Sequence, residues 1–561
     1  MGEAADHPAR PWVRVRQLFR PERGELLALV LYAVAVAVLS LATPIAVETL
    51  VNTVAFGVLL WPVVAIAGVL FGCLGLAAGI RALQVFVVEC LQRRLFVRVV
   101  ADYAHRLPRV RADALDGRHG PELANRFFDV LTLQKSAAVL LLDGLAVGVT
   151  TGVGMTVLAF YHPFLLGFDV ALLVALAVLL FVLGTGGVRT ALDESHVKYA
   201  VAAWLEELLR GHRPLKFAGG RHLAVGRADE LAAEYVAARR AHFAVVWRQT
   251  VFALGVQVVA GTALLGLGGW LVVDRQLTLG QLVAAELIVA LVVASVAKLG
   301  KYAEAYFDLL AAAEKLGLLT DLPLDRAGGE ELADRPGGLA VRAAGLTRAG
   351  GRAVRVPDFT AAPGDRVAVV GPAGAGKTTL AEVLCGLREP GPGVLELDGV
   401  DLRGLCPDRL RERVALVGRD DLFAGTVAEN VRVGRPHLTP AEVREALHTA
   451  GLTADVYALP AGLDTPLPPA GGPLAGSRAV RLGVARALAG RPRLLVLDGV
   501  LDGLDPRDCP DLVPRLFDRA APWTLVVVTR DPALIARCDR VVDLGPKAAP
   551  LDLILAGGLN E

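Results

Sequence analysis

The sequence has few of the residues that build metal sites and disulfide frameworks. Its 561 residues include six cysteines and two methionines, and the cysteines show no paired metal-ligand spacing. We therefore expect buried or incidental thiols in a reducing compartment. A charge excess of one sign is also missing, because the formal net charge is only +1. No global field favours a nucleic-acid partner.

Apolar residues, in contrast, are abundant. They make up 54% of the chain, and the mean hydropathy of +0.51 is too high for one soluble domain of this length. Six apolar runs cover residues 26 to about 45, 58–80, 136–160, 163–186, 249–273 and 279–297. Each is about 20 residues long, enough to cross a bilayer as a helix. Buried helices of a soluble domain are the alternative, but six such runs in one half of a chain favour a membrane domain. The first run is too long for the apolar core of a cleaved signal peptide.

The distribution of arginine and lysine predicts the orientation of these spans. Basic residues crowd the N-terminal segment, residues 81–135, residues 189–248 and everything after Lys298. The other connections are short and carry almost no positive charge. Both termini are therefore expected in the cytoplasm, and spans two to five are expected to extend well beyond the membrane as helices.

A glycine-rich turn follows the β-branched run 367–370 and precedes the helix-prone run 380–384. Its residues are Gly371, Pro372, Ala373, Gly374, Ala375, Gly376, Lys377, Thr378 and Thr379. Strand, glycine-rich turn and helix form the context of a phosphate-binding P-loop, in which backbone N–H groups approach phosphate oxygens. We expect Lys377 to reach the β- and γ-phosphates of a nucleotide and the Thr378 hydroxyl to bind Mg²⁺. A chance glycine-rich turn is the alternative, which this context disfavours.

Both halves of the chain resemble the ATP-binding-cassette exporters, in which six spans are fused to one nucleotide-binding domain. Residues 205–219 and 120–126 resemble the family's second and first cytoplasmic loops, and residues 280–285 resemble the start of its sixth span. The resemblance implies an all-α transmembrane domain of six helices followed by an α/β P-loop NTPase domain. It implies a cytoplasmic segment over 1–24, a transmembrane domain over 25–319, a linker over 320–337 and a nucleotide-binding domain over 338–561.

Within the second half, the resemblance identifies further parts of a nucleotide site. Asp498 follows the strand 494–497 and matches a magnesium-holding position, and Asp505 matches the aspartate of the next loop. The family's signature, normally Leu-Ser-Gly-Gly-Gln, is replaced by Leu474, Ala475, Gly476, Ser477 and Arg478. Ala475 therefore stands where the family has the serine whose hydroxyl faces the phosphate.

The residues that carry out hydrolysis in the family are replaced. Gly499 stands where a glutamate polarises the attacking water, and Arg530 stands where a histidine is expected. Arg419 replaces a glutamine, and Arg348 replaces the aromatic residue that stacks on adenine. We favour an arginine-rich composition with relaxed selection as the explanation. The alternative is a site rebuilt to grip ATP without hydrolysing it, in which arginines stack on adenine or pair with phosphate.

Several polar residues fall within or near the predicted spans. They are Glu48, Asn52, Asp143, Asp169, Glu286 and Lys298. Carboxylates inside a membrane are candidate functional groups because burying them in lipid is costly. Asp143 and Glu286 lie deepest in their runs, so each is expected to face a translocation cavity or to form an interhelical hydrogen bond.

The sequence leaves several functions open. The first is a half-transporter of the cytoplasmic membrane that exports a peptide, lipid or drug-like substrate. Such a half must dimerise, and the degenerate site favours a heterodimer with a more intact partner. The second is a regulatory or scaffolding membrane protein that binds ATP without hydrolysing it. A soluble P-loop kinase or GTPase with a membrane anchor is disfavoured, because one anchor does not need six spans.

Overall fold

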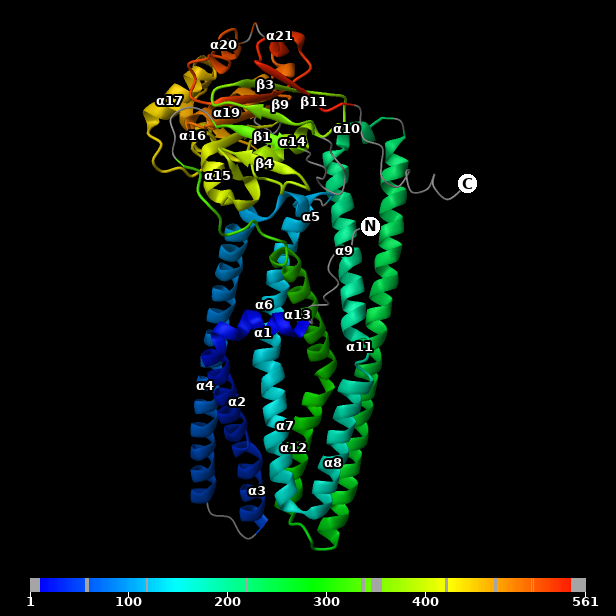
Figure 1. The fold of residues 1–561 in the computed structure, drawn as a ribbon. Helices are drawn as coiled ribbons and strands as arrows, with labels where there is room; N and C mark the ends of the chain where they lie inside the picture. The colour runs from blue at the N-terminus through cyan, green and yellow to red at the C-terminus, as the bar shows by residue number, and fades with distance from the viewer. Residues whose placement is uncertain are drawn as a thin grey trace. The chain divides into compact units, whose positions relative to one another are not determined.

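The structure is a computed structural model in which the chain forms two compact units, each described here by itself (Figure 1). The first comprises Met1–Pro108 and Arg118–Leu322, and the second comprises Arg109–Gly117 and Pro323–Glu561. The residues that the structure describes are 11–55, 60–117, 120–217, 219–333, 339–344, 356–418, 422–468, 472–505, 507 and 509–545.

Long helices make up the first unit, as the apolar runs predict. They are α1 (Pro11–Phe19), α2 (Arg23–Ser40), α3 (Ala42–Ala55), α4 (Leu60–Arg106), α5 (Gly120–Asn125), α6 (Asp129–Val139), α7 (Leu145–Tyr161), α8 (Pro163–Ala177), α9 (Gly187–Arg210), α10 (His212–Leu215), α11 (Gly220–Val273), α12 (Leu279–Ala297) and α13 (Leu299–Thr320). Short π-helical turns, η5 (Leu140–Gly144) and η6 (Val178–Val182), continue α6 into α7 and extend α8. Helices α4 and α11 have 47 and 54 residues. At 1.5 Å per residue they are about 70 and 80 Å long, more than twice a hydrocarbon core of about 30 Å.

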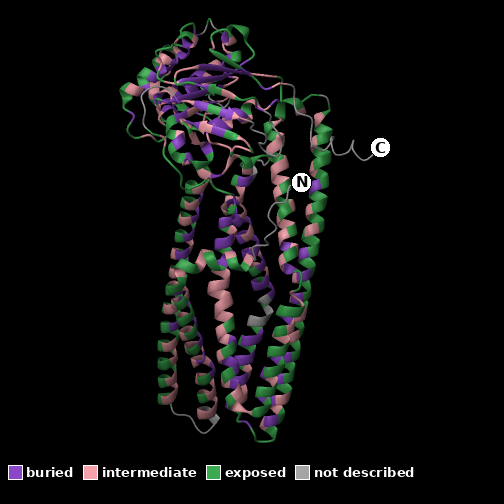
Figure 2. Ribbon diagram, viewed as in Figure 1, coloured by how far each residue is buried: buried purple, intermediate pink, exposed green. Residues whose placement is uncertain are grey.

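Five helical stretches among the described residues are long and apolar enough to cross a membrane. They are Pro11–Thr53, Leu60–Arg109, Leu123–Tyr161, Pro163–Arg210 and Gly220–Val273. The sixth predicted span corresponds to the shorter apolar helix Leu279–Ala294 within α12. Large apolar side chains face outward on these helices, with Trp61, Phe71 and Phe181 between 77% and 83% exposed. Figure 2 shows exposed and half-buried residues along the helices of this unit. Outward-facing apolar surface of this extent fits contact with lipid.

A buried polar cluster connects α6, α9 and α13 beyond the predicted spans. The Tyr199 hydroxyl donates a hydrogen bond of 2.6 Å to Asp129, and the Lys315 ammonium lies 3.9 Å from the same carboxylate. It also lies 4.1 Å from the centre of the Tyr199 ring. Lys315 is only 2% exposed, and burial is the largest cause that lowers its pKa to about 8.

The second unit is built on a five-stranded parallel sheet in the order β11-β3-β10-β9-β6. Its strands are β3 (Arg366–Val370), β6 (Val414–Val417), β9 (Leu494–Asp498), β10 (Thr524–Val528) and β11 (Arg540–Asp543). Val526 of β10 pairs with Val367 of β3 and with Val496 of β9. All five residues of β10 are buried, because helices and a second sheet cover the two faces of a parallel sheet.

Alternate residues of the central strands enter different cores. Leu495, Leu497 and Val527 join a cluster with residues of the helices over one face. Val496 and Val526 join a cluster on the other face. The helices of this unit are α14 (Lys377–Leu384), α15 (Pro407–Arg413), α16 (Val427–Arg432), α17 (Pro440–Thr449), α18 (Thr453–Tyr457), α19 (Ser477–Ala489), α20 (Leu512–Leu516) and α21 (Pro532–Ile535). This arrangement confirms the prediction of an α-helical transmembrane domain followed by an α/β P-loop NTPase domain.

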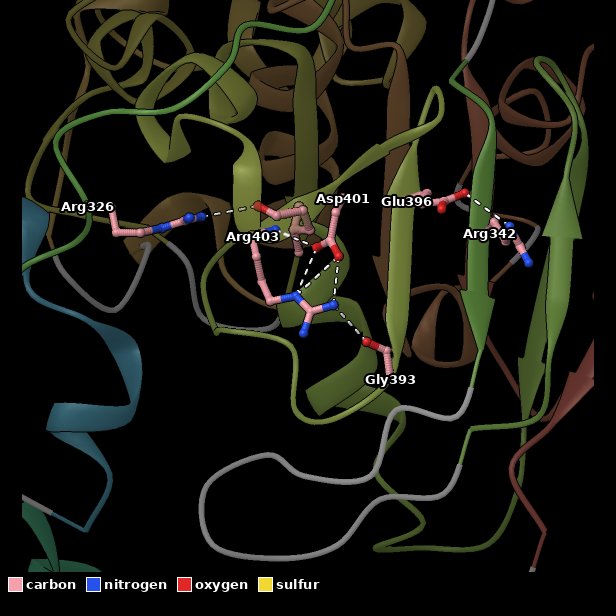
Figure 3. A network of polar contacts seen from close by, with 7 residues as sticks. Arg326, Arg342, Gly393, Glu396, Asp401 and Arg403 are labelled. Carbon is pink, nitrogen blue, oxygen red and sulfur yellow. Dashed lines mark hydrogen bonds and ion pairs between the residues drawn. The ribbon is translucent and has the colours of Figure 1, made fainter.

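An antiparallel sheet in the order β2-β1-β4-β5 accompanies the parallel one. Its strands are β2 (Phe359–Ala361), β1 (Val341–Ala344), β4 (Val394–Leu397) and β5 (Val400–Asp401), and β7 (Gly425–Thr426) pairs with β8 (Pro466–Leu467) elsewhere in the unit. Arg342 and Glu396 form an exposed ion pair of 3.4 Å across β1 and β4, and Arg403 pairs with Asp401 at 2.6 Å (Figure 3). Arg326 of the predicted linker donates to the carbonyls of Leu402 and Leu405, each at 3.1 Å.

One ion pair in this unit is buried. The guanidinium of Arg493 and the carboxylate of Asp398 are 2.8 Å apart, and their side chains are only 8% and 6% exposed. Asp398 also accepts the N–H of Ala340 at 2.9 Å, and Arg493 donates to the carbonyl of Ala333 at 2.8 Å. The pair therefore has the additional hydrogen bonds that a buried charge requires.

The segment Arg109–Gly117 belongs to the second unit although it lies between α4 and α5 in the chain. Val110 forms an antiparallel bridge with Leu324, and the N–H of Arg111 donates to the carbonyl of Pro323 at 3.0 Å. The guanidinium of Arg388 pairs with Asp116 at 2.6 Å and holds the pKa of that carboxyl below its usual value. Backbone and charge together therefore fix this segment.

Candidate nucleotide site

The P-loop prediction falls on the turn between β3 and α14. Gly374 and Gly376 have φ angles of +79° and +97°, in the left-handed region that glycine adopts at least cost. The Lys377 ammonium donates to the carbonyls of Gly371 and Pro372 at 2.8 and 2.7 Å. Carbonyl groups of the turn therefore hold the lysine ammonium, and α14 begins at Lys377 itself.

This geometry fits a polyphosphate with a divalent cation. The first-turn N–H groups of α14 have no acceptor within the helix, and the helix dipole places partial positive charge there. Thr378 lies exposed in that first turn, where its hydroxyl could bind a cation. Asp498 is the last residue of β9, and β10 lies between β9 and β3 in the sheet. Because the strands are parallel, their carboxyl ends meet at the same edge.

Three charged groups at or just after the ends of β9 and β10 act on Lys377 at this edge. Burial is the largest cause that lowers the pKa of Lys377, and the positive charge of Arg530 lowers it further. The carboxylates of Asp498 and Asp502 act in the opposite direction. Lys377, Asp498 and Arg530, each predicted from sequence, therefore lie in one electrostatic environment.

Asp502 is a member of this cluster that the sequence did not single out. It lies in the turn η10 (Leu501–Gly503) and accepts a short hydrogen bond from the Thr529 hydroxyl. It also accepts the backbone N–H of Arg530 at 3.1 Å. Asp502 thus connects the loop after β9 with the end of β10. The only sequence signal was a second acidic residue close behind Asp498, because the pairing joins residues far apart in the chain.

Gly499 occupies the position at which the resemblance calls for a glutamate. Its N–H donates to the carbonyl of Val528 at 3.0 Å, and its φ angle is +66°. A Cβ atom added there would meet no described atom within 4 Å. Space is therefore available for a side chain, but the backbone conformation disfavours one.

The residues at the signature position begin α19. Leu474 is buried, Ala475 is exposed, and Gly476 precedes the helix with a φ angle of +64°. Ser477 is the first residue of α19. Arg478 forms an ion pair of 2.8 Å with Asp455, and the buried Arg481 reaches the same carboxylate at 3.1 Å.

Arg478 therefore has an acidic partner within its own domain. Asp455 lies on α18, so an interaction of Arg478 with phosphate would first have to break this ion pair. Arg348 and Arg419 lie outside the described residues. Asp505 accepts the N–H of Arg507 at 2.8 Å in a local turn.

The two intramembrane candidates have different environments. Asp143 pairs with Arg81 at 3.2 Å, with both side chains about half exposed. Glu286 has one buried oxygen with no hydrogen-bond partner among the described residues. Asp169, which the sequence did not rank highest, is only 3% exposed, and both of its oxygens lack a described partner. Glu48 accepts a hydrogen bond of 2.7 Å from the Tyr161 hydroxyl.

Comparisons with known proteins agree with this architecture. The family model described as "ABC transporter transmembrane region" matches residues 26–296, and the model described as "ABC transporter" matches residues 354–501. The chain is 27% identical over 540 residues to the mouse "ATP-binding cassette sub-family B member 10, mitochondrial", covering 91% of this chain and 73% of that protein. It is 32% identical over 354 residues to an "ATP-dependent lipid A-core flippase" of Thiobacillus denitrificans, covering 61% of this chain and 60% of that protein.

A solved structure titled "Structure of a bacterial Atm1-family ABC exporter with ATP bound" superposes with a TM-score of 0.81. It covers 96% of this chain and 97% of the other chain, at 22% sequence identity. At that identity the likeness concerns the fold.

Proposed function

Because the chain belongs to the ATP-binding-cassette transporter family and joins a transmembrane region to a nucleotide-binding domain, we propose that it is the catalytically degenerate half of a heterodimeric exporter. Family membership implies ATP binding, generally with Mg²⁺, and half-transporters act as dimers in a membrane. The heterodimer, the export direction and the degenerate role are our proposal. We place the protein in the cytoplasmic membrane, with both termini in the cytoplasm.

The contrast between binding and catalytic groups carries this proposal. The groups that would hold Mg-ATP, Lys377, Thr378 and Asp498, lie at one edge of the parallel sheet. At the same edge, Gly499 has no side chain that could position water. A general base typically contributes about 10²–10⁴-fold to a rate, so this chain would bind ATP and leave most hydrolysis to its partner.

The transported substrate is proposed only by class. Exporters of this family move peptides, lipids and drug-like molecules, and one relative is named as a lipid A-core flippase. A lipid is therefore one of the three candidate classes of transported substrate. Substrate-stimulated ATP turnover, measured with each class in turn, would select among them.

Purification from the native host tests the pairing. We expect a second, homologous half to co-purify, and we expect ATP hydrolysis by the complex to stop when the partner's catalytic glutamate is replaced. Lys377→Ala should reduce nucleotide occupancy with a smaller effect on the rate. The partner's P-loop site, completed by the altered signature 474–478, should run slowly, since a missing phosphate donor costs about 2.7–4 kcal/mol in a comparable oxyanion site. Rapid hydrolysis by a homodimer, lost in Lys377→Ala, would contradict the proposal.

Gly499→Glu tests the missing base directly. A left-handed conformation costs a non-glycine residue about 1–2 kcal/mol, or about 5–30-fold. This cost is smaller than the contribution of most general bases, so we expect the complex to gain at least severalfold in rate. Gly499→Gln is the matched control, because it adds similar bulk without a base and should give no gain.

A non-hydrolysing regulatory or scaffolding protein is the second candidate. The ion pair between Arg478 and Asp455 favours this second function, because the pair holds the signature arginine within its own domain. ATP binding without hydrolysis in every purified complex, including one that contains an intact partner, would select this function.

A further inference from the structure

Helix α1 crosses the long helices of the first unit (Figure 1). Arg14 ties it to α13 through ion pairs with Glu314 at 3.4 Å and Asp321 at 2.5 Å. Trp12 and Val13 nevertheless remain 56% and 44% exposed. A short crosswise helix with exposed tryptophan and basic residues is typical of a helix that lies in the membrane interface.

The position of α1 along the bundle places it near the cytoplasmic headgroups. Leu29, close to the start of α2, packs with Val88 and Leu91 of α4, and its carbonyl accepts from Gln84. Gln84 lies about 24 residues beyond Leu60, where α4 begins, which is a rise of about 36 Å. This slightly exceeds a hydrocarbon core of about 30 Å. If α4 begins at the outer surface, α1 lies at the inner one.

A cavity of about 390 Å³ opens beside α1. Its walls are mainly apolar, with Val15, Phe19 and Leu26 on one side and Leu140 and Leu309 on the other. This size is within the range of small-molecule sites. An apolar cavity at headgroup depth fits part of an acyl chain.

Three arginines line the same cavity: Arg16, Arg20 and Arg23. All three are exposed, and within the described part of the chain their side chains have no ion pair or hydrogen bond. The nearby acids are already engaged, because Arg94 pairs with Glu22 and Glu25, and Arg98 pairs with Glu22. The cluster therefore carries uncompensated positive charge directly beside apolar walls.

We propose that this cavity binds an anionic phospholipid of the cytoplasmic leaflet. The phosphate would lie among the three arginines, whose planar guanidinium groups suit phosphate oxygens, and an acyl chain would enter the apolar cavity. The site depends on the membrane orientation proposed above, but it does not depend on a heterodimer or on hydrolysis. Lipid binding is therefore measured without nucleotide.

Native mass spectrometry of the full chain tests the headgroup preference. In detergent with equal phosphatidylglycerol and phosphatidylcholine of the same acyl chains, we expect the wild type to retain phosphatidylglycerol preferentially. Basic residues near an anionic surface contribute about fivefold each, so the combined Arg16→Gln, Arg20→Gln and Arg23→Gln variant should retain at least tenfold less. The matched control replaces three exposed arginines away from the cavity, Arg213, Arg221 and Arg240, and should retain as much as the wild type. Equal retention of the two lipids by the wild type, or equal losses in both triple variants, would overturn the proposal.

A photo-crosslinking amino acid at Leu140 identifies the occupant without altering the arginines. After illumination in membranes that contain phosphatidylglycerol, we expect an adduct with the mass of that lipid. Crosslinks only to a protein chain would mean that a partner helix fills the cavity, which would overturn the proposal. Leu140→Trp should reduce lipid retention without changing charge, whereas unchanged retention would exclude this cavity as the binding site.

Discussion

Replacing Lys377 separates a binding role from a structural one. A charge-assisted hydrogen bond is worth about 1.5–3 kcal/mol, which corresponds to about 10–150-fold in affinity. The ammonium already donates to the carbonyls of Gly371 and Pro372 at 2.8 and 2.7 Å. When a phosphate binds, the ammonium must exchange some of these hydrogen bonds for hydrogen bonds to phosphate oxygens. We therefore expect Lys377→Ala to weaken Mg-ATP binding by an amount close to the lower limit, about tenfold.

The thermal stability of the same variant should respond differently. Burial is the largest cause of the lowered pKa of Lys377, so the folded domain bears a cost for keeping this charge partly desolvated. Removing the ammonium should leave the melting temperature without nucleotide unchanged or slightly higher. A titration with a fluorescent ATP analogue and a thermal melt of the full chain measure the two effects.

Arg444→Ala provides the control for this experiment, because Arg444 is an exposed residue of α17. It should change neither the affinity nor the melting temperature. Equal affinity of the wild type and Lys377→Ala would refute the assignment of the P-loop. A large fall in the melting temperature of Lys377→Ala would instead show that its hydrogen bonds to the loop are mainly structural.

Three further predictions concern topology, buried charge and pH. In a cysteine-free background, a cysteine at Arg275 should react with an impermeant probe from outside, and one at Arg213 should react only after permeabilisation; the reverse pattern would refute the orientation. Asp398→Ala should destabilise the nucleotide-binding domain by about 3–5 kcal/mol, because it removes the carboxylate that pairs with the buried guanidinium of Arg493, whereas Glu396→Ala at the exposed pair should cost less than about 1 kcal/mol in the same denaturation experiment. Between about pH 8 and 10.5 the folded chain binds fewer protons at Lys315 than the unfolded chain does, so stability should rise with pH in this range. Thermal melts in detergent should show this rise in the wild type and not in Lys315→Met.

The sequence predicted those features that depend on local patterns. Apolar runs of about 20 residues identified the long helices, because a bilayer sets a minimum length. The glycine spacing around Lys377 identified the turn between β3 and α14, because only certain residues adopt its backbone angles. Family resemblance then identified Asp498 and Gly499 at the end of β9, a strand of the same parallel sheet.

Features that depend on distant pairing could not be predicted in the same way. The ion pair between Arg478 and Asp455 joins two helices, and nothing near Arg478 in the chain identifies its partner. Nothing in the sequence distinguishes Asp502 from the acidic residues around it, because its hydrogen bond with Thr529 forms only in the folded domain. In the membrane unit, position within the apolar run favoured Asp143, but that residue pairs with Arg81, whereas Asp169 is more deeply buried. Burial depends on which helix faces pack together.

The assignment of Arg109–Gly117 to the second unit has a consequence for connectivity. The polypeptide passes between the two units three times, after Pro108, after Gly117 and after Leu322. One cut in the segment 320–337 would separate the residues after it covalently from the first unit, whereas Arg109–Gly117 would stay joined to that unit at both ends. An expressed fragment that starts at residue 338 would lack both residues of the bridge between Val110 and Leu324, and it would lack Asp116, the acidic partner of Arg388. The unit that carries the P-loop is therefore discontinuous in sequence, and its stability is best measured in the whole chain.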